Sequence, residues 1–346
     1  MAKIAFGVMG DAMGHITFSS IVASLLPEHE FLFLGGGKIT QISKLGYDTV
    51  EIPMMSTYYS NNQVDLKSTI YNGCRILFRR NSVLNHIEGI LRDFSPDLVL
   101  SNYEYFTPLA ARRLGIPCVS VDHQHILTEC DWPVDPGGVL GRLLLKAPLK
   151  FLYSNADKYI VTSFFSLTPK DPSRTQVTPS VLRPVVRNFT DSAGDHVLVY
   201  QTSPSFLPLL ETLGNTGASY RIYGFGAKSS RKNLEFRANS VEGFLEDLST
   251  CKYAIVNGGH NVISESLHYR KPVLCFPIRL AYEQTLNAFM IKHLGYGDYS
   301  SEVRPNEKTF TDFELRLDEY RANVERGDFF GNPRMAEKLR SMIPNG

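Results

Sequence analysis

The chain has 346 residues, 43% of them hydrophobic, and its 36 basic and 35 acidic residues leave a net charge of +1. This length suits two domains of ordinary size, and the near-neutral charge argues against a nucleic-acid partner. No apolar run approaches the roughly 18 residues that span a bilayer, and the start of the chain lacks the pattern of a signal peptide. The five cysteines are scattered without zinc spacing, which is typical of reduced thiols in a cytoplasmic protein.

Short apolar runs alternate with helical segments in the first half of the chain, which predicts an α/β fold with a doubly wound parallel sheet. The expected strands are 3–9, 31–34, 49–52, 97–101, 117–121, 159–162 and 181–183. The expected helices are 16–26, 66–94 and 107–114. Residues 54–67 are polar and irregular, so a lid, an acceptor surface or a plain connection would fit them.

The ends of the first two strands bear on the choice of cofactor. Residues 10–15, Gly-Asp-Ala-Met-Gly-His, are glycine-rich but do not match Gly-x-Gly-x-x-Gly. The second strand ends in Gly35-Gly36-Gly37, where a dinucleotide-binding fold would place an acidic ribose ligand. Both features argue against an NAD site.

The strand at 117–121 leads into Asp122, His123, Gln124 and His125. Open α/β sheets bind ligands at the carboxyl ends of their strands, so these side chains are candidates for a site. The alternating histidines suggest a metal ion, but without further ligands the indication is weak.

Residues 138–154 are apolar except for Arg142, Lys146 and Lys150, which recur every four residues along one helical face. Such a stripe suits a helix lying on anionic lipid. A core helix with a solvated basic face, interrupted by Pro148, explains the same pattern equally well.

The composition divides the chain into an N-terminal domain at 1–184, a linker at 185–194, a C-terminal domain at 195–330 and a last helix at 331–346, which could pack back on the N-terminal domain. The second domain has expected strands at 196–200, 220–223, 234–237, 253–256 and 272–276. Its expected helices are 205–213 and 241–248, with charged helices following at 311–323 and 333–343. Two such sheets in sequence predict a cleft between the domains.

The densest group of polar residues follows the strand at 253–256. The turn Asn257-Gly258-Gly259 leads into a helix that Asn261 is expected to cap. Unpaired amides at the start of that helix, beside a turn without side chains, favour a bound phosphate. Glu265 lies one turn further on the same face, where its carboxylate could accept hydrogen bonds from two ribose hydroxyls.

A second polar cluster opens the next helix with Glu283, Gln284 and Asn287. An ordinary βαβ unit with a solvated polar face would show some of these features. The convergence of both clusters on one loop edge favours a binding site.

The run of residues 256–297 resembles the nucleotide-sugar motif of inverting glycosyltransferases of the GT-B fold. The likeness is to the murein lipid-intermediate N-acetylglucosaminyltransferase, the UDP-glucuronosyl and plant secondary-metabolite transferases, and microbial relatives. The matching positions are Gly258, Gly259, Ser264, Glu265, Pro272, Pro277, Glu283, Gln284, Asn287 and Ala288. The loop at 10–15 similarly resembles the family's Gly-x-Gly-His loop through Gly14 and His15.

This resemblance implies two Rossmann-like domains facing across a cleft, with the donor bound in the second. Its pyrophosphate would meet Gly258, Gly259 and His260, and its ribose Glu265. Glu283 and Gln284 would bind the sugar hydroxyls, and the base would pack near 238–244 against Phe244. The remaining donor-side residues are Thr202, Asn261, Ser264 and Asn287. Here Gln201-Thr202-Ser203 replaces the family's glycine turn, which weakens that part of the match.

The resemblance also implies that His15 takes a proton from the acceptor hydroxyl during an in-line displacement that inverts the anomeric carbon. In the small-molecule transferases an aspartate orients this histidine, but the aligned position here is Asn102. Glu104 or Asp122 could substitute, or His15 could only position the acceptor. Gly14, His123 and His125 would lie on the acceptor side.

We therefore expect a transferase that moves a sugar from a nucleotide-sugar, most simply a UDP-sugar, to a hydroxyl. The absence of Asp-x-Asp agrees with a reaction that needs no metal or other cofactor. The acceptor could be lipid-linked, with the protein peripheral on the inner face of the membrane. A nucleotide-sugar hydrolase, a 2-epimerase or a non-catalytic binding subunit are the alternatives, although the epimerase turn Asp-Ser-Gly-Gly reads Val256-Asn257-Gly258-Gly259 here.

Overall fold

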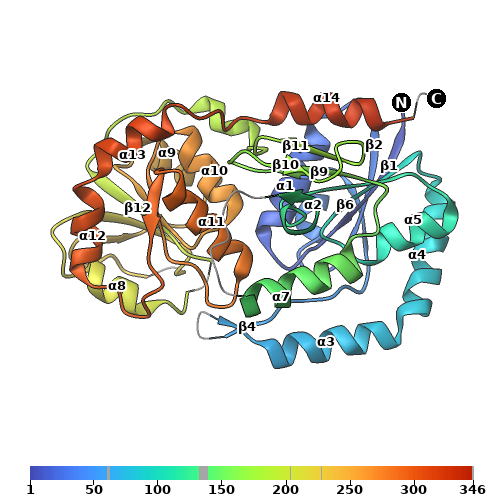
Figure 1. The fold of residues 1–346 in the computed structure, drawn as a ribbon, viewed down its shortest axis with the longest axis horizontal. Helices are drawn as coiled ribbons and strands as arrows, with labels where there is room; N and C mark the ends of the chain where they lie inside the picture. Colours follow the sequence, from blue (N-terminus) through green and yellow to red (C-terminus); the bar gives the residue numbers. More distant parts are fainter. Residues whose placement is uncertain (61–62, 132–138, 203, 227, 345–346) are drawn as a thin grey trace. The chain divides into compact units, whose positions relative to one another are not determined.

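The computed structural model describes residues 1–60, 63–131, 139–202, 204–226 and 228–344. Its internal contacts divide the chain into two compact units (Figure 1). Unit 1 comprises Met1–Tyr58, Asp65–Arg183 and Phe330–Gly346, and unit 2 comprises Tyr59–Val64 and Pro184–Phe329. The described part of the chain contains no helix that is both long and apolar enough to cross a membrane.

Unit 1 is built on a seven-stranded sheet in the order β11-β9-β7-β6-β1-β2-β3, in which every pair of neighbours is parallel. The strands are β1 (Lys3–Val8), β2 (Glu30–Gly35), β3 (Asp48–Glu51), β6 (Leu98–Asn102), β7 (Cys118–Asp122), β9 (Lys158–Thr162) and β11 (Thr175–Thr178). A short antiparallel pair, β8 (Cys130–Asp131) and β10 (Thr168–Pro169), lies beside it.

The helices of unit 1 cover a sheet whose central strands are buried on both faces, as parallel sheets require. They are α1 (Met13–Ser24), α2 (Thr40–Ser43), α3 (Leu66–Phe78), α4 (Arg80–Phe94), α5 (Phe106–Leu114), α6 (Ile126–Glu129), α7 (Val139–Pro148) and α14 (Asn332–Met342). The core joins Ile4 and Phe6 of β1 to Val22 of α1 and to Met335 and Leu339 of α14. The last helix therefore belongs to the core of unit 1 (Figure 1).

Unit 2 has a six-stranded sheet in the order β14-β13-β12-β15-β16-β17, again parallel throughout. Its strands are β12 (His196–Tyr200), β13 (Ser219–Tyr223), β14 (Leu234–Phe236), β15 (Ala254–Val256), β16 (Val273–Cys275) and β17 (Gly297–Tyr299). Its helices are α8 (Leu207–Leu213), α9 (Val241–Thr250), α10 (His260–His268), α11 (Tyr282–His293), α12 (Glu307–Glu314) and α13 (Leu317–Val324). The predicted doubly wound α/β architecture is confirmed in both units.

The structure of unit 1 differs from the local predictions at several places. No strand forms at 181–183, because the backbone N–H and C=O of Leu182 instead bond the side chain of Asn332 at 2.8 Å each. The edge strand is β11, whose polar residues do not read as an apolar run. The segment at 66–94 is two helices that meet at Arg79. After Pro148, α7 continues as a π-helix, Leu149–Tyr153.

The segment at 54–67 does not form one loop. Residues up to Tyr58 belong to unit 1, whereas β4 (Tyr59–Ser60) and β5 (Gln63–Val64) belong to unit 2. There the N–H of Val64 donates to the carbonyl of Arg279 at 3.2 Å. Asn61 and Asn62 lie outside the described residues. The hairpin is thus attached to the loop that follows β16.

Candidate functional site

The carboxyl edge of the unit 2 sheet carries a turn that only glycine can make. Gly258 follows β15 with a φ of +87°, and a Cβ there would lie 2.7 Å from the backbone oxygen of Gln284. Both facts exclude a side chain. The turn therefore keeps the approach to α10 open.

The start of α10 is left without a capping side chain. Gly259 occupies the N-cap position and makes no side-chain hydrogen bond, so the prediction that Asn261 caps this helix is wrong. Asn261 is instead the second residue of the helix, after His260. The first amides of α10 thus receive nothing from a cap, and such amides at a helix's positive end are suited to an anion.

Asn257 fixes this edge, although the sequence indicated it only as part of a turn. Its Nδ2 donates to Thr202 Oγ1 at 2.7 Å and to Gln284 Oε1 at 3.4 Å. Gln284 Oε1 also accepts from the N–H of Ile278 at 3.0 Å, and Asn287 Nδ2 donates to the carbonyl of Gly258 at 3.1 Å. Thr202, Gln284 and Asn287 are therefore brought together with the glycine turn.

Two buried atoms at this edge have no hydrogen-bond partner among the described residues: Asn257 Oδ1 and Gln201 Nε2. Asn257 and Gln201 are at most 1% exposed. Because buried polar groups are almost always bonded, an acceptor and a donor left open at one loop edge point to a ligand. Gln201 follows β12 directly, and Asn257 follows β15, the neighbouring strand.

Ser264 and Glu265 lie in α10 at 0% and 2% exposure. Ser264 Oγ donates to the carbonyl of His260 at 2.8 Å, which gives it a role inside the helix. Phe244 offers no open ring face for the nucleotide base to stack on. It is 7% exposed, and its ring meets Tyr200 and Tyr223 edge-on at centroid distances of 5.5 and 5.2 Å.

In unit 1, Gly14 and His15 lie in the first turn of α1, which begins at Met13 and not at residue 16. The Nδ1 of His15 lies 2.9 Å from Asn102 Oδ1. Asn102 is buried at the end of β6, and its Nδ2 donates to Ser19 Oγ at 2.9 Å and to the carbonyl of His15 at 3.3 Å. Because the amide group is oriented by these two bonds, its oxygen faces the imidazole.

A stack of rings supports the other side of this histidine. Tyr103 lies parallel to His15 at a centroid distance of 5.8 Å and to Tyr153 at 4.3 Å. Tyr103 has a φ of +52°, a costly conformation for a bulky residue that is often seen at functional sites. Sequence reasoning missed both tyrosines, since Tyr153 lies 50 positions beyond Tyr103 and nothing local links them.

A carboxylate near His15 was also missed. Asp11 lies on the loop before α1, half-buried, and its Oδ2 has no hydrogen-bond partner in the described part of the chain. Burial raises the pKa of Asp11, and bonds to Ser56 and Thr57, together with the positive charges of Lys38 and His15, partly offset this effect. The position of Asp11 in the glycine-rich loop at 10–15, close to His15 in sequence, is the feature that could have indicated it.

Glu104 and Asp122 have other partners and do not replace the family's aspartate. Glu104 accepts from the N–H groups of Phe106 and Thr107 at 2.9 and 2.6 Å, so it caps α5. Burial raises the pKa of Glu104 despite these bonds. The carboxylate of Glu104 therefore binds the start of α5 and does not orient His15.

Asp122 forms a buried pair with His125. Its Oδ2 lies 2.6 Å from His125 Nδ1 and 2.7 Å from Ser120 Oγ, and its Oδ1 accepts from the N–H of His125 at 2.9 Å. Burial alone would raise the pKa of Asp122, but the charge of His125 and these hydrogen bonds together lower it. The pair holds the start of α6.

His123 and His125 do not share a ligand, although their spacing suggests one. His125 is bound to Asp122, whereas His123 Nδ1 lies 2.7 Å from the carbonyl of Thr162. They are 4% and 1% exposed, so neither offers an acceptor surface within unit 1. No group of three or more potential metal ligands occurs among the described residues.

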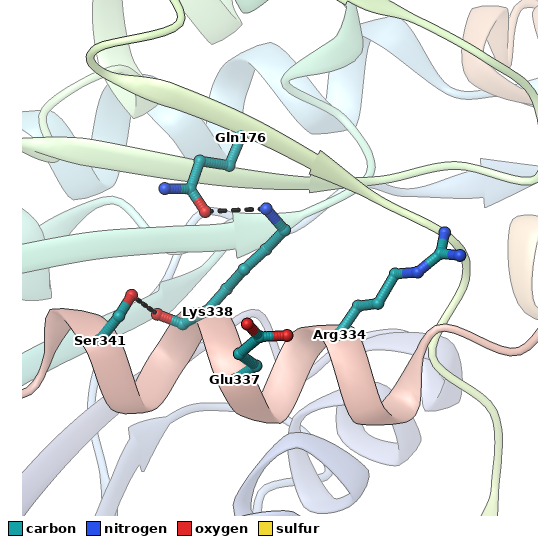
Figure 2. Close-up of a pocket in the computed structure, with 5 residues that line it drawn as sticks. All are labelled: Gln176, Arg334, Glu337, Lys338 and Ser341. Atoms are coloured by element: carbon teal, nitrogen blue, oxygen red, sulfur yellow. Dashed lines mark hydrogen bonds between the residues drawn. The ribbon is translucent and has the colours of Figure 1, made fainter.

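Two cavities of the described structure lie on different units. One of about 140 Å³ lies in unit 2, lined by Phe206, Phe276, Pro277 and Arg279 among others, at the carboxyl ends of β12 and β16. The other, of about 380 Å³, lies between β11 and α14 (Figure 2). Its lining residues are Gln176, Arg334, Glu337, Lys338 and Ser341, none of them a predicted site residue. Lys338 Nζ donates to Gln176 Oε1 at 3.0 Å across it.

Two parallel sheets in one chain, one with a glycine turn at a helix start and the other with a histidine in its first helix, are the features of a GT-B glycosyltransferase. The chain belongs to glycosyl transferase family 1, whose family model matches residues 2–317. An uncharacterized glycosyltransferase of Methanosarcina mazei is 25% identical over 339 residues, which cover 88% of each chain.

Solved structures agree in fold. The glycotransferase of kitacinnamycin superposes with a TM-score of 0.71 at 15% identity over 99% of both chains. Acinetobacter baumannii MurG gives 0.64 at 13% identity over 99% of this chain and 100% of that one. The predicted GT-B fold is thus confirmed, and the protein is a glycosyltransferase, an enzyme class that uses nucleotide-sugar donors.

Proposed function

We propose that this enzyme transfers a sugar from a nucleotide-sugar, in the first instance a UDP-sugar, to a hydroxyl group with inversion and without a metal ion. The observation that carries the donor half is the edge of unit 2. There the turn at Gly258 and the uncapped start of α10 supply amides for a diphosphate, and Gln201 Nε2 adds an unused donor. Such donors can stabilise a departing nucleoside diphosphate in place of a cation.

The proposed donor contacts follow from this edge. Gly258, Gly259 and His260 would meet the diphosphate, and Glu265 the ribose. The Oε1 of Gln284 is used by Ile278 and Asn257, so its NH₂ group, which bonds no described residue, is the part that can donate to a sugar hydroxyl. Glu283 precedes it in the first turn of α11. Asn287 would position the glycine turn, and the open Oδ1 of Asn257 would accept a hydrogen bond from the donor.

We propose His15 as the general base, because its hydrogen bond to Asn102 determines which ring nitrogen carries the proton. Asn102 Oδ1 can only accept a hydrogen bond, so Nδ1 of the neutral imidazole carries the proton. The lone pair then lies on Nε2, which can take a proton from an acceptor hydroxyl. Asn102 orients the ring as an aspartate would, but it adds no negative charge to stabilise the imidazolium.

The acceptor is proposed to be lipid-linked or part of the cell envelope, with the enzyme on the inner face of the membrane. The support from 138–154 is partial: Lys150 is exposed, but Arg142 and Lys146 are half-buried. Burial lowers the pKa of Lys146, as does repulsion by Lys170, Arg142 and Lys150. An anionic surface would relieve the repulsion that these three cations exert on Lys146, which Asp131 only partly offsets.

The test is to incubate the purified protein with UDP-, dTDP- and GDP-sugars, with and without phenolic and polyprenol-linked hydroxyl acceptors, and to measure nucleoside diphosphate. Release that requires an acceptor, persists in EDTA and yields a product of opposite anomeric configuration supports the proposal. Release without acceptor indicates a hydrolase. Failure to bind any nucleotide would overturn the donor site.

A further inference from the structure

Helix α3 of unit 1 exposes an unusual amount of apolar surface. Of its 13 residues only Asn72 and Ile76 are buried. Four large apolar side chains are exposed instead: Ile70 at 61%, Tyr71 at 73%, Leu77 at 36% and Phe78 at 93%. Helical geometry places these four within an arc of about 120°, on the side opposite Asn72 and Ile76.

The helix is held in this orientation by polar bonds on its inner side. Asn72 Oδ1 accepts from the N–H of Ser56 at 3.0 Å, and Thr69 Oγ1 accepts from the N–H of Tyr58 at 3.1 Å. Asp65 caps its start by accepting from the N–H of Ser68 at 3.1 Å. The outward direction of the apolar side chains is therefore set by unit 1 itself. Figure 1 shows α3 at the periphery of that unit.

Beyond its capping residue Asp65, the charge on α3 and directly after it is of one sign. Lys67, Arg75, Arg79 and Arg80 lie on or directly after α3, and no acidic residue occurs from position 66 through 87. Arg75, Arg79 and Arg80 are exposed and make no ion pair with any described residue. An apolar face that includes aromatic rings, flanked by unpaired arginines, is the composition of helices that lie in the headgroup layer.

We infer that the outer face of α3 binds the surface of an anionic membrane, with Ile70, Tyr71, Leu77 and Phe78 in the interface and the arginines at the phosphates. A second copy of the chain fits this face less well, because a symmetric contact would oppose the same arginines. An acidic protein would satisfy the charges but leave no reason for the aromatic and aliphatic side chains to remain exposed.

The inference concerns a surface and not the transfer chemistry, so the two proposals can fail separately. It also moves the predicted membrane contact: the stripe at 138–154 is partly buried, whereas the face of α3 is not. If the acceptor is lipid-linked, this helix would hold unit 1 at the surface where that acceptor lies.

The test is sedimentation with phosphatidylcholine vesicles that contain or lack phosphatidylglycerol. The wild type should bind the anionic vesicles, and the double variant Ile70→Ser/Phe78→Ser should lose about tenfold or more in partitioning. The variant Arg75→Glu/Arg79→Glu should lose a similar factor in partitioning at low salt, and this loss should disappear at high salt, where charges are screened. The matched control is Leu45→Ser/Leu315→Ser, which removes two leucines that are 62% and 80% exposed elsewhere.

Unchanged thermal melting and UDP binding of each variant would show that the fold is intact. The inference is overturned if the wild type does not prefer anionic vesicles, or if the α3 variants bind as the leucine control does. It is also overturned if Lys146→Glu/Lys150→Glu alone abolishes binding, or if the α3 variants change only self-association in sedimentation equilibrium. Vesicle binding without sugar transfer would leave this surface standing while refuting the proposed function.

Discussion

The carboxyl edges of the two sheets are built from different material. In unit 2 the edge is mostly backbone and consists of a glycine turn and an uncapped helix start. The side chains of Asn257, Gln284 and Asn287 form hydrogen bonds that fix this turn. In unit 1 the edge is made of side chains, with His15 between the amide of Asn102 and the ring of Tyr103. The first arrangement suits a constant group such as a diphosphate, and the second suits a group that differs from enzyme to enzyme.

The two edges should therefore respond differently to substitution. Side-chain truncation in unit 1 should remove chemistry and leave donor binding intact. At the glycine turn of unit 2, added bulk should weaken donor binding, because the backbone makes the proposed diphosphate contacts there. The predictions for His15, Gly258 and Asn102 test this difference, and those for Asp122 and Glu104 test the buried carboxylates beside the unit 1 edge.

The largest effect is expected for His15→Ala. Loss of a general base should lower kcat by about 10²–10⁴-fold, while the Kd for UDP stays within about twofold of the wild type. Turnover would be measured by nucleoside diphosphate release and binding by calorimetry. Glu265→Ala should show the reverse, with weakened nucleotide binding.

The matched control is His86→Ala, which removes an exposed histidine of α4 and should leave both quantities unchanged. If His15→Ala retains wild-type turnover, the histidine only positions the acceptor. If, in addition, Glu265→Ala abolishes the biological activity, the protein would be a nucleotide-sugar-binding subunit and not the catalyst.

The next effect is on stability. Asp122→Asn leaves His125 without its buried charged partner and should lower the free energy of unfolding by about 3 kcal/mol at pH 7. The pKa of Asp122 is lowered on folding, so its contribution is present above about pH 4 and is lost as the pH falls through the folded-state pKa. Urea unfolding at several pH values would show the deficit of the variant shrinking in acid.

Glu104→Gln provides a comparison of opposite sign. The pKa of Glu104 is raised on folding, so its contribution is complete below the unfolded pKa and falls as the pH rises through the folded one. The advantage of the wild type over this variant should therefore shrink in base. Identical pH trends for the two variants would contradict the assignment of these carboxylates.

Gly258→Ala tests the backbone edge. Its φ of +87° and the approach of a Cβ to within 2.7 Å of the Gln284 backbone oxygen should cost about 1–3 kcal/mol, felt as a donor affinity about tenfold weaker. Gly46→Ala is the matched control, with a φ of +91° and nothing within 4 Å of the added carbon. It measures the cost of the backbone conformation alone. If Gly258→Ala and Gly46→Ala changed UDP binding equally, Gly258 would not be part of the donor site.

The contrast between the edges also explains what could be predicted from sequence. The sequence predicts the local structure of the unit 2 edge, because the turn at Gly258, the helix after it and Gln284 lie within one short stretch. The misassigned cap shows the limit. Asn261 is a good capping residue, but Gly259 takes the extended conformation (φ −67°, ψ 133°) that ends the loop one position earlier.

The unit 1 edge could not be predicted in the same way. His15 and Asn102 meet across 87 positions of sequence, and Tyr153 joins them from further away. Glu104 and Asp122 are plausible partners for a histidine until their own bonds, to the start of α5 and to His125, are seen. The strand alternation that predicted the doubly wound sheets carries no information on such pairings, so β11, with its polar residues, was missed as well.

The smallest effect is expected for Asn102→Asp, which would introduce a charged residue beside His15, as the resemblance to the small-molecule transferases implies for that position. The imidazolium would gain a negative partner 2.9 Å from Nδ1, so the acid limb of the kcat/KM profile should move to higher pH by about one unit. The bonds to Ser19 and to the His15 carbonyl lose their donor, which limits the gain in rate. Asn102→Ala, which removes both the orientation and the charge, should lower kcat without moving the limb. If the acid limb stays in place in Asn102→Asp, either Asp11 already supplies the negative charge or His15 is not the titrating group. Adding Asp11→Asn to this variant decides between the two explanations. The limb then moves to lower pH only if Asp11 supplies the charge.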